Sequence, residues 1–148
     1  MATKKSRDTY WFARKLDLEN YSLLVACGGD GTYHEVVNGM LAREDNYKLP
    51  IGVIPNGSGN DTCRSLGVNS VNDALDLIVH AEVLAMDTIR VLIDTENFED
   101  IRLDEFDALD KCRYMVNDLC LAMTARISYE GAKYKGCFGT NCYAVATI

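Results

Sequence analysis

The chain has 148 residues, of which 48% are hydrophobic and 25% are charged. This composition is typical of an ordinary globular domain and excludes a disordered or collagen-like chain. Lysine and arginine total 15 against 22 aspartates and glutamates, which gives a formal net charge of -7. So acidic a chain is not expected to bind nucleic acid or an anionic membrane by electrostatics alone.

The cysteines and histidines indicate neither a zinc site nor a disulfide framework. No two of the six cysteines have Cys-x-x-Cys spacing, and the two histidines are isolated. Residues 1–15 are basic and polar, and no later run approaches the ~20 apolar residues of a membrane-spanning helix. We therefore expect a cytoplasmic protein with reduced thiols, peripheral at membranes if it meets them.

The first half of the chain predicts a strand, a glycine-rich loop and a helix, twice in succession. The apolar run 21–27 ends in glycines and suits a strand buried on both faces of a parallel sheet. Over 33–43 apolar residues recur three and four positions apart, as in a helix that packs on a sheet. The run 49–55 predicts a second strand, and Ser70 with Asp73 has the spacing of a capping box that opens a helix ending near 81 or 82.

Beyond residue 85 the pattern favours strands, over 88–93 and 111–123. Between Asp94 and Asp110 lie eight acidic residues and one arginine, so this segment carries the whole net charge. We expect it to be a solvent-exposed loop between two antiparallel strands. A domain boundary near 83–87 would divide the chain into an α/β part, 1–85, and a β-rich part, 86–148.

The two glycine-rich loops are candidate phosphate sites. Each lies between a buried strand and a helix, where backbone N–H groups at the positive end of the helix dipole can bind phosphate. The first lacks the lysine of a P-loop, and the second has Thr62 where the dinucleotide pattern requires glycine or alanine. Each loop also carries a carboxylate, Asp30 or Asp61, which can assist phosphate binding only through a metal or a proton. Either loop alone could be a simple tight turn, whereas the pair indicates a polyphosphate ligand.

Both loops resemble those of the catalytic domain of diacylglycerol kinases and sphingosine kinases. The resemblance is weaker at 86–88 and 114–125, where the family has further strands and a helix. The segment 34–40 is similar to the sphingosine and ceramide kinase branch in particular. The motifs that carry the resemblance are Gly28-Gly29-Asp30-Gly31-Thr32-x-x-Glu35-x-x-Asn38-Gly39 and Pro50-Ile51-Gly52-Val53-Ile54-Pro55-x-Gly57-Ser58-Gly59-Asn60-Asp61.

The resemblance implies an α/β fold of the NAD kinase/diacylglycerol kinase-like type. A Rossmann-like parallel-sheet domain, truncated at its N-terminus, would be followed by the start of an antiparallel β-sandwich. The family's first strand, which ends in Asn-Pro, and its late Asp-Gly-Glu element have no counterpart here. We therefore expect the middle part of a lipid kinase, either a piece of a longer protein or a truncated chain.

The resemblance also implies ATP and Mg²⁺ as cofactors, with transfer of the γ-phosphate to the hydroxyl of a sphingoid base, ceramide or diacylglycerol. Asp30 would be the catalytic residue, either as the base for the acceptor proton or as the ligand of a magnesium-bound water. The implied nucleotide-binding residues are Gly28, Gly29, Gly31, Thr32, Glu35, Gly57, Ser58, Gly59, Asn60 and Arg64.

Several of these positions have a second interpretation. Glu35 and Asn38 could order the first loop from behind or lie on a solvated helix face. Asp61 is expected to cap the helix that follows it, and Arg64 could reach phosphate or pair with Asp61. His34 is expected to be a partly exposed helix residue.

Two other functions stay open on the sequence. Without the family's first strand the sheet has an open edge, so the chain could be an inactive nucleotide-binding fragment that associates with a partner or with itself. NAD kinases share the first loop, although the second is closer to that of the lipid kinases. For a lipid kinase we expect a lipid alcohol as substrate, transient contact with a membrane surface, and no nucleic acid partner.

Overall fold

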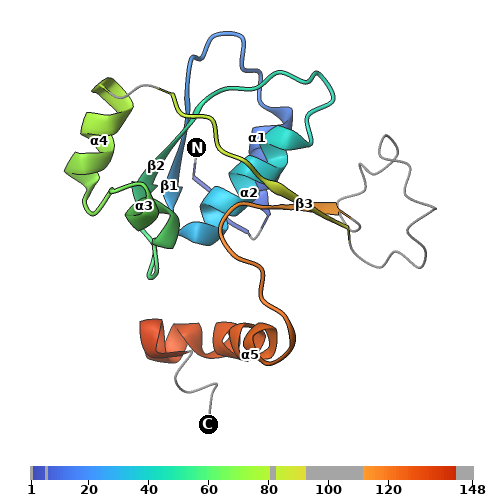
Figure 1. Ribbon diagram of the computed structural model, residues 1–148, viewed down its shortest axis with the longest axis vertical. Helices are drawn as coiled ribbons and strands as arrows, with labels where there is room; N and C mark the ends of the chain where they lie inside the picture. The colour runs from blue at the N-terminus through green and yellow to red at the C-terminus, as the bar shows by residue number, and fades with distance from the viewer. Residues whose placement is uncertain (1, 6, 81–82, 93–111, 143–148) are drawn as a thin grey trace.

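The computed structural model describes residues 2–5, 7–80, 83–92 and 112–142. At its centre β1 (Leu24–Gly28) and β2 (Ile51–Pro55) form a parallel two-stranded sheet, and α2 (Asp30–Leu41) connects them. Parallel neighbours require such a crossover, which places both glycine loops at the same end of the sheet. The predicted succession of strand, loop and helix is confirmed (Figure 1).

The first strand begins later than the run 21–27 predicts. Leu24 lies opposite Ile51, and its N–H donates to the carbonyl oxygen of Pro50 at 3.0 Å. The N–H of Tyr21 instead donates to the carbonyl of Leu18 at 3.0 Å, and the Tyr21 side chain is exposed. Strand pairing begins only where the partner strand begins, and apolar character alone does not reveal that point.

The hydrophobic core lies between this sheet and the helices beside it. α1 (Asp8–Lys15), in a segment where the sequence predicts no element, packs along α2. The two helices approach so closely at Gly39 that a Cβ there would lie 2.3 Å from the carbonyl oxygen of Tyr10. The buried members of the core cluster are Ala13, Ala26, Tyr33, Val36, Val37, Val53, Cys63, Val68 and Ala74.

α3 (Asp61–Ser65) and α4 (Val71–His80) follow the second loop. The predicted capping box is confirmed, because the N–H of Asp73 donates to Ser70 Oγ at 3.1 Å and the N–H of Ser70 donates to Asp73 Oδ2 at 2.9 Å. α4 then packs against β2 through the buried Ala74. This packing fixes the strand whose end carries the second loop.

β3 (Ile89–Leu92) and β4 (Cys112–Met115) form an antiparallel pair, as predicted, and β4 packs on α2. β4 is much shorter than the expected strand 111–123, because its partner β3 begins at Ile89, opposite Met115. The chain instead forms α5 (Ala122–Phe138) and the short helix η2 (Gly139–Asn141). The acidic loop 94–110 lies outside the described residues, so its exposure stays a prediction, as do the domain boundary and the start of a β-sandwich.

Candidate functional site

The two glycine loops touch each other through backbone atoms. A Cβ at Gly57 would lie 2.3 Å from the Cα of Gly29, and a Cβ at Gly29 would lie 3.0 Å from the Cα of Gly57. The N–H of Asn56 donates to the carbonyl of Gly28 at 2.9 Å and extends the strand pairing into the loops. Any larger residue at Gly57 would separate them, so glycine at this contact joins the loops into one backbone surface.

Asp30 joins the first loop to the helix that follows the second. Its carboxylate accepts the N–H of Thr62 at 2.9 Å and the N–H of Asp61 at 3.2 Å. These amides open α3 and have no acceptor within that helix. The N-cap residue Asn60 makes no side-chain cap bond. The carboxylate that caps α3 is thus that of Asp30, and the expectation that Asp61 caps it is wrong.

The same contacts determine the charge of Asp30. Partial burial raises the pKa of its carboxyl group, but the hydrogen bonds from Thr62 and Asp61 outweigh burial and leave the pKa below its ordinary value. Asp30 is therefore a carboxylate at neutral pH. Negative charge at the start of α2 and α3 is also favoured by the dipoles of these helices.

Some loop amides are used inside the loops and others are open. The N–H of Thr32 donates to the carbonyl of Gly29 at 3.0 Å, and that of Gly57 donates to Asn60 Oδ1 at 2.8 Å. Within the described part of the chain, the N–H groups of Gly31, Ser58 and Gly59 make no hydrogen bond, and all three residues line a cavity. These three amides are available for an anion.

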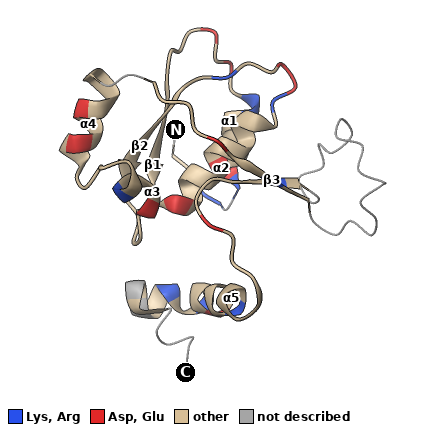
Figure 2. Ribbon diagram, in the orientation of Figure 1, with Lys and Arg blue, Asp and Glu red and all other residues tan. Residues whose placement is uncertain are grey.

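A cavity of about 650 Å³ lies over the joined loops. Its opposite side is formed by Asn117 and Asp118, which follow β4, and by Ser128 and Lys135 of α5. Figure 2 shows acidic residues at the starts of α2 and α3 and basic residues on α5 across from them. Lys135 is the one cation among the described residues that line the cavity. The lining thus combines open amides, hydroxyls, carboxylates and one ammonium group, and it draws on both sides of the predicted domain boundary.

The family model of the diacylglycerol kinase catalytic domain matches residues 1–91. The chain belongs to this family. Diacylglycerol kinases of Staphylococcus aureus strains JH9 and Newman are 42% identical over 87 residues, which cover 58% of this chain and 27% of theirs. The chain thus spans about a quarter of the length of these relatives.

Solved structures agree with the family at the level of the fold. A diacylglycerol kinase from Bacillus anthracis str. Sterne, 22% identical, matches with a TM-score of 0.57 over 97% of this chain and 43% of that chain. Another Bacillus anthracis chain is 31% identical and has a TM-score of 0.53, covering 62% of this chain and 32% of its own. The predicted α/β fold with a parallel sheet is confirmed.

The structure brings most of the predicted site residues of this diacylglycerol kinase family member together, but not all. Glu35 lies elsewhere, since its carboxylate accepts the N–H of Arg7 at 3.1 Å and the hydroxyl of Thr9. Asn60 binds its own loop, with Nδ2 donating to the carbonyl of Gly57 at 2.8 Å. The predicted residues that line the cavity are Gly28, Gly29, Asp30, Gly31, Thr32, Gly57, Ser58 and Gly59.

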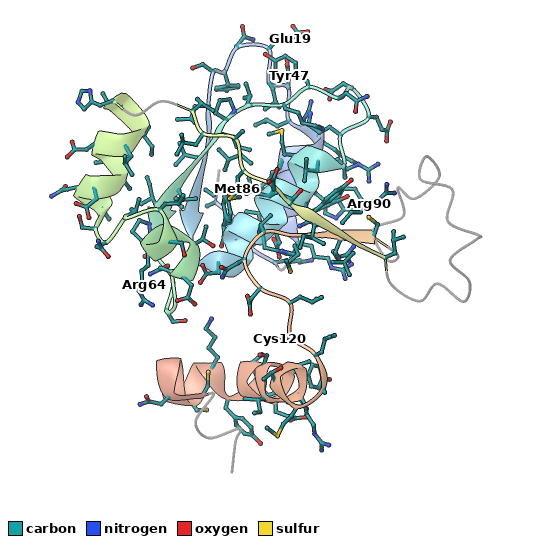
Figure 3. The ribbon with its side chains drawn as sticks, viewed as in Figure 1. Glu19, Tyr47, Arg64, Met86, Arg90 and Cys120 are labelled. Carbon is teal, nitrogen blue, oxygen red and sulfur yellow. The ribbon has the colours of Figure 1, made fainter. Side chains whose placement is uncertain are left out.

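Arg64 also lies outside the cavity lining. Its Nη1 is 2.9 Å from Asp61 Oδ1, so of the two interpretations the structure has the ion pair. Both side chains are more than half exposed, and such a pair contributes little to stability. Figure 3 shows Arg64 on α3, with Cys120 on the connection that leads to α5.

The residues that sequence reasoning missed lie between 117 and 135, after the range 1–91 that the family model matches. Asn117, Asp118, Ser128 and Lys135 reach the cavity because β4 ends early and α5 follows, whereas the sequence predicts a continuous strand there. Asn38, which could have lain on a solvated face, is 5% exposed and binds β4. His34 is half-buried, and burial together with the charge of Arg113 lowers its pKa, an effect that Glu35 partly offsets.

No helix in the described ranges combines the length and the apolar character that a membrane crossing requires.

Proposed function

We propose that this chain is the nucleotide-binding segment of an ATP-dependent lipid kinase, in which the γ-phosphate of ATP passes to a lipid hydroxyl. The observation that carries the proposal is the contact between Gly29 and Gly57 beneath a cavity of about 650 Å³. This contact supplies open amides from two loops on one surface, as a triphosphate requires. Membership of the diacylglycerol kinase family supports the reaction class.

In this proposal the phosphate chain lies against the N–H groups of Gly31, Ser58 and Gly59. The start of α2, a helix of 12 residues, adds its positive dipole end to these donors. Lys135 then neutralises phosphate charge from the opposite side of the cavity. Backbone N–H groups contact only the phosphates and do not distinguish one nucleotide base from another. This part of the site therefore recognises the phosphate chain, and adenine would be recognised by other contacts.

The residues present fit the Mg²⁺ that accompanies ATP. Asp30 Oδ2 and Asp61 Oδ2 lie 3.1 Å and 3.2 Å from the position that a Cβ would occupy at Gly59, so both face one edge of the cavity. In the described ranges no group of three or more His, Cys, Asp or Glu side chains could hold a metal. Mg²⁺ is commonly bound by one or two carboxylates together with phosphates and water, so two carboxylates suffice. When bound, the metal would neutralise charge that develops on the transferred phosphoryl group.

Of the two roles open to Asp30, the observations favour the ligand of a magnesium-bound water. An efficient general base has a pKa near the working pH, whereas the pKa of Asp30 lies below its ordinary value. A carboxylate held ionised by two backbone amides is better suited to a cation. We propose that Asp30 would hold the metal through a bound water and does not itself take the proton of the acceptor hydroxyl.

The proposed acceptor is the hydroxyl of diacylglycerol, a sphingoid base or ceramide. The names of the relatives favour diacylglycerol, while the segment 34–40 resembles the sphingosine and ceramide branch. An acceptor of this kind also requires transient contact with a membrane surface. The family match argues against NAD as the acceptor.

The test is phosphoryl transfer by the 148-residue chain from radiolabelled Mg-ATP to diacylglycerol, sphingosine, ceramide or NAD. Labelled lipid that disappears in Asp30→Asn supports the proposal. Labelled NAD would overturn the choice of acceptor class. Nucleotide binding without transfer to any acceptor would make the chain a binding segment only.

A second candidate function, association through the sheet edge, is favoured by β1. In the described part of the chain β1 pairs with β2 on one side only. Beside β1 lies a largely apolar groove of about 510 Å³, and Val25 on this strand is 40% exposed. Unpaired edges of this kind bind other strands. Light scattering that shows a mass rising with concentration would support association, and a constant monomer mass would contradict it.

A further inference from the structure

The side chain of Asn38 on α2 binds both main-chain groups, the N–H and the carbonyl, of one residue of β4. Its Nδ2 donates to the carbonyl of Tyr114 at 2.9 Å, and its Oδ1 accepts the N–H of Tyr114 at 2.8 Å. Nδ2 also donates to the carbonyl of His34 at 2.9 Å. Both amide hydrogens and one oxygen lone pair are therefore used, which fixes the orientation of the amide.

The register of the β3–β4 pair explains why Tyr114 is available. Tyr114 lies opposite Arg90. In an antiparallel pair each residue either exchanges both main-chain hydrogen bonds with its partner or directs both outward. Since Asn38 binds both the N–H and the carbonyl of Tyr114, the Tyr114–Arg90 pair is the kind that directs its main-chain groups outward. The side-chain amide of Asn38 thus occupies the position where a further strand would pair with β4.

This contact joins the two sides of the cavity. α2 begins at Asp30, which is eight residues, or about 12 Å along the helix, from Asn38. Three and four residues after Tyr114 the chain reaches Asn117 and Asp118 in the cavity lining, and it continues into α5 with Lys135. Asn38 is 5% exposed, so water does not compete strongly for its hydrogen bonds.

We propose that Asn38 is a positioning residue that clamps β4 to α2 and thereby holds residues 117–135 over the glycine loops. The part of this inference that concerns ligand affinity rests on the proposed nucleotide function. Loss of the clamp leaves both loops intact but releases the side of the cavity that carries Lys135. Affinity for Mg-ATP then falls although Asn38 touches no ligand.

The test compares Asn38→Leu with Val36→Ala in the full chain. Leucine has a similar size but leaves the main chain of Tyr114 unpaired. Val36 is also buried on α2, but it faces the groove beside β1 and controls for a general loss of packing. Hydrogen exchange of the Tyr114 amide and calorimetric titration with Mg-ATP are the two measurements.

We expect Asn38→Leu to speed exchange of the Tyr114 amide at least tenfold and to weaken Mg-ATP binding about tenfold. In Val36→Ala the exchange rate of the Tyr114 amide and the affinity for Mg-ATP should both stay within twofold of wild type. This should hold even if Val36→Ala lowers the melting temperature as much as Asn38→Leu does. Unchanged exchange at Tyr114, or fast exchange with wild-type affinity, would overturn the inference. If Asn38→Leu does not fold, Asn38→Ser, which cannot reach both groups of Tyr114, is judged by the same readouts.

If the wild-type chain binds no Mg-ATP, the proposed function fails, and the clamp is judged on the free protein. Faster exchange at Tyr114 together with shifted amide resonances of Asn117 and Asp118 in Asn38→Leu would then support it. Unchanged resonances at these two residues would overturn it.

Discussion

The carboxylate of Asp30, in the first turn of α2, accepts the backbone N–H of Thr62, in the first turn of α3, at 2.9 Å. A residue of the first glycine loop thus caps the helix that follows the second. The bond couples the cavity to the fold, because Asp30 lines the cavity and its carboxylate also attaches α3.

Asp30→Asn should abolish phosphoryl transfer and leave the chain folded. The amide keeps one oxygen acceptor for α3 but loses the negative charge, so we expect the free energy of unfolding to fall by about 1 kcal/mol. Urea unfolding and the transfer assay measure the two effects. Activity comparable to that of wild type would remove Asp30 from the mechanism.

The contribution of Asp30 to stability should depend on pH. Because its pKa is lowered on folding, the contribution is complete above the pKa of the unfolded chain and is lost as the pH falls through the folded pKa. The difference in unfolding free energy between wild type and Asp30→Asn should thus be constant above about pH 5 and shrink in more acidic solution. A difference that grows on acidification would contradict the assigned sign.

Gly57→Ala should separate the two loops. The new Cβ would lie 2.3 Å from the Cα of Gly29, a backbone atom that cannot move away without loop displacement. We expect a loss of about 1–3 kcal/mol in stability, as for overpacked sites, and a loss of Mg-ATP binding. Thermal unfolding and calorimetric titration measure these effects.

Gly136→Ala is the matched control for this substitution. No atom lies within 4 Å of its new Cβ, and the position is helical in α5. It should leave Mg-ATP binding unchanged and stabilise α5 by up to about 1 kcal/mol. Equal losses of binding in both variants would show that the contact between the loops has no special role.

Lys135→Ala should weaken Mg-ATP binding about tenfold, which corresponds to about 1.4 kcal/mol. It should also reduce the dependence of binding on salt, because a charge contact with phosphate is lost.

Lys133→Ala is the control for Lys135, two positions away on the same helix. Lys133 is paired with Glu130 at 2.8 Å and lies 4.5 Å from the centre of the Tyr129 ring, outside the cavity lining. Its removal should change affinity less than twofold. Similar effects of the two substitutions would show that net charge and not position determines binding.

The α/β part of the fold could be predicted because its signals are local. Strand, loop and helix alternate with clear periodicity, and Ser70 with Asp73 marks the start of α4 within a single turn. The glycines that line the cavity could be predicted for the same reason, since strand-to-helix loops bring them to one edge of the sheet.

The rest depends on contacts between distant segments. Asp30 binds α3, Glu35 binds the start of α1, and Asn38 binds Tyr114, and these three roles follow from packing that residue spacing does not encode. The end of β4 depends on where β3 begins, so the entry of α5 and of Lys135 into the cavity could not be read from 111–123.

The most direct test of the proposed polyphosphate site is a titration of the isotopically labelled chain with Mg-ATP, followed by NMR of its backbone amides. The amides of Gly31, Ser58 and Gly59 should shift most, while those of α4 stay unchanged. Saturating nucleotide that leaves these three amides unmoved, or that shifts only amides outside the two loops, would contradict it.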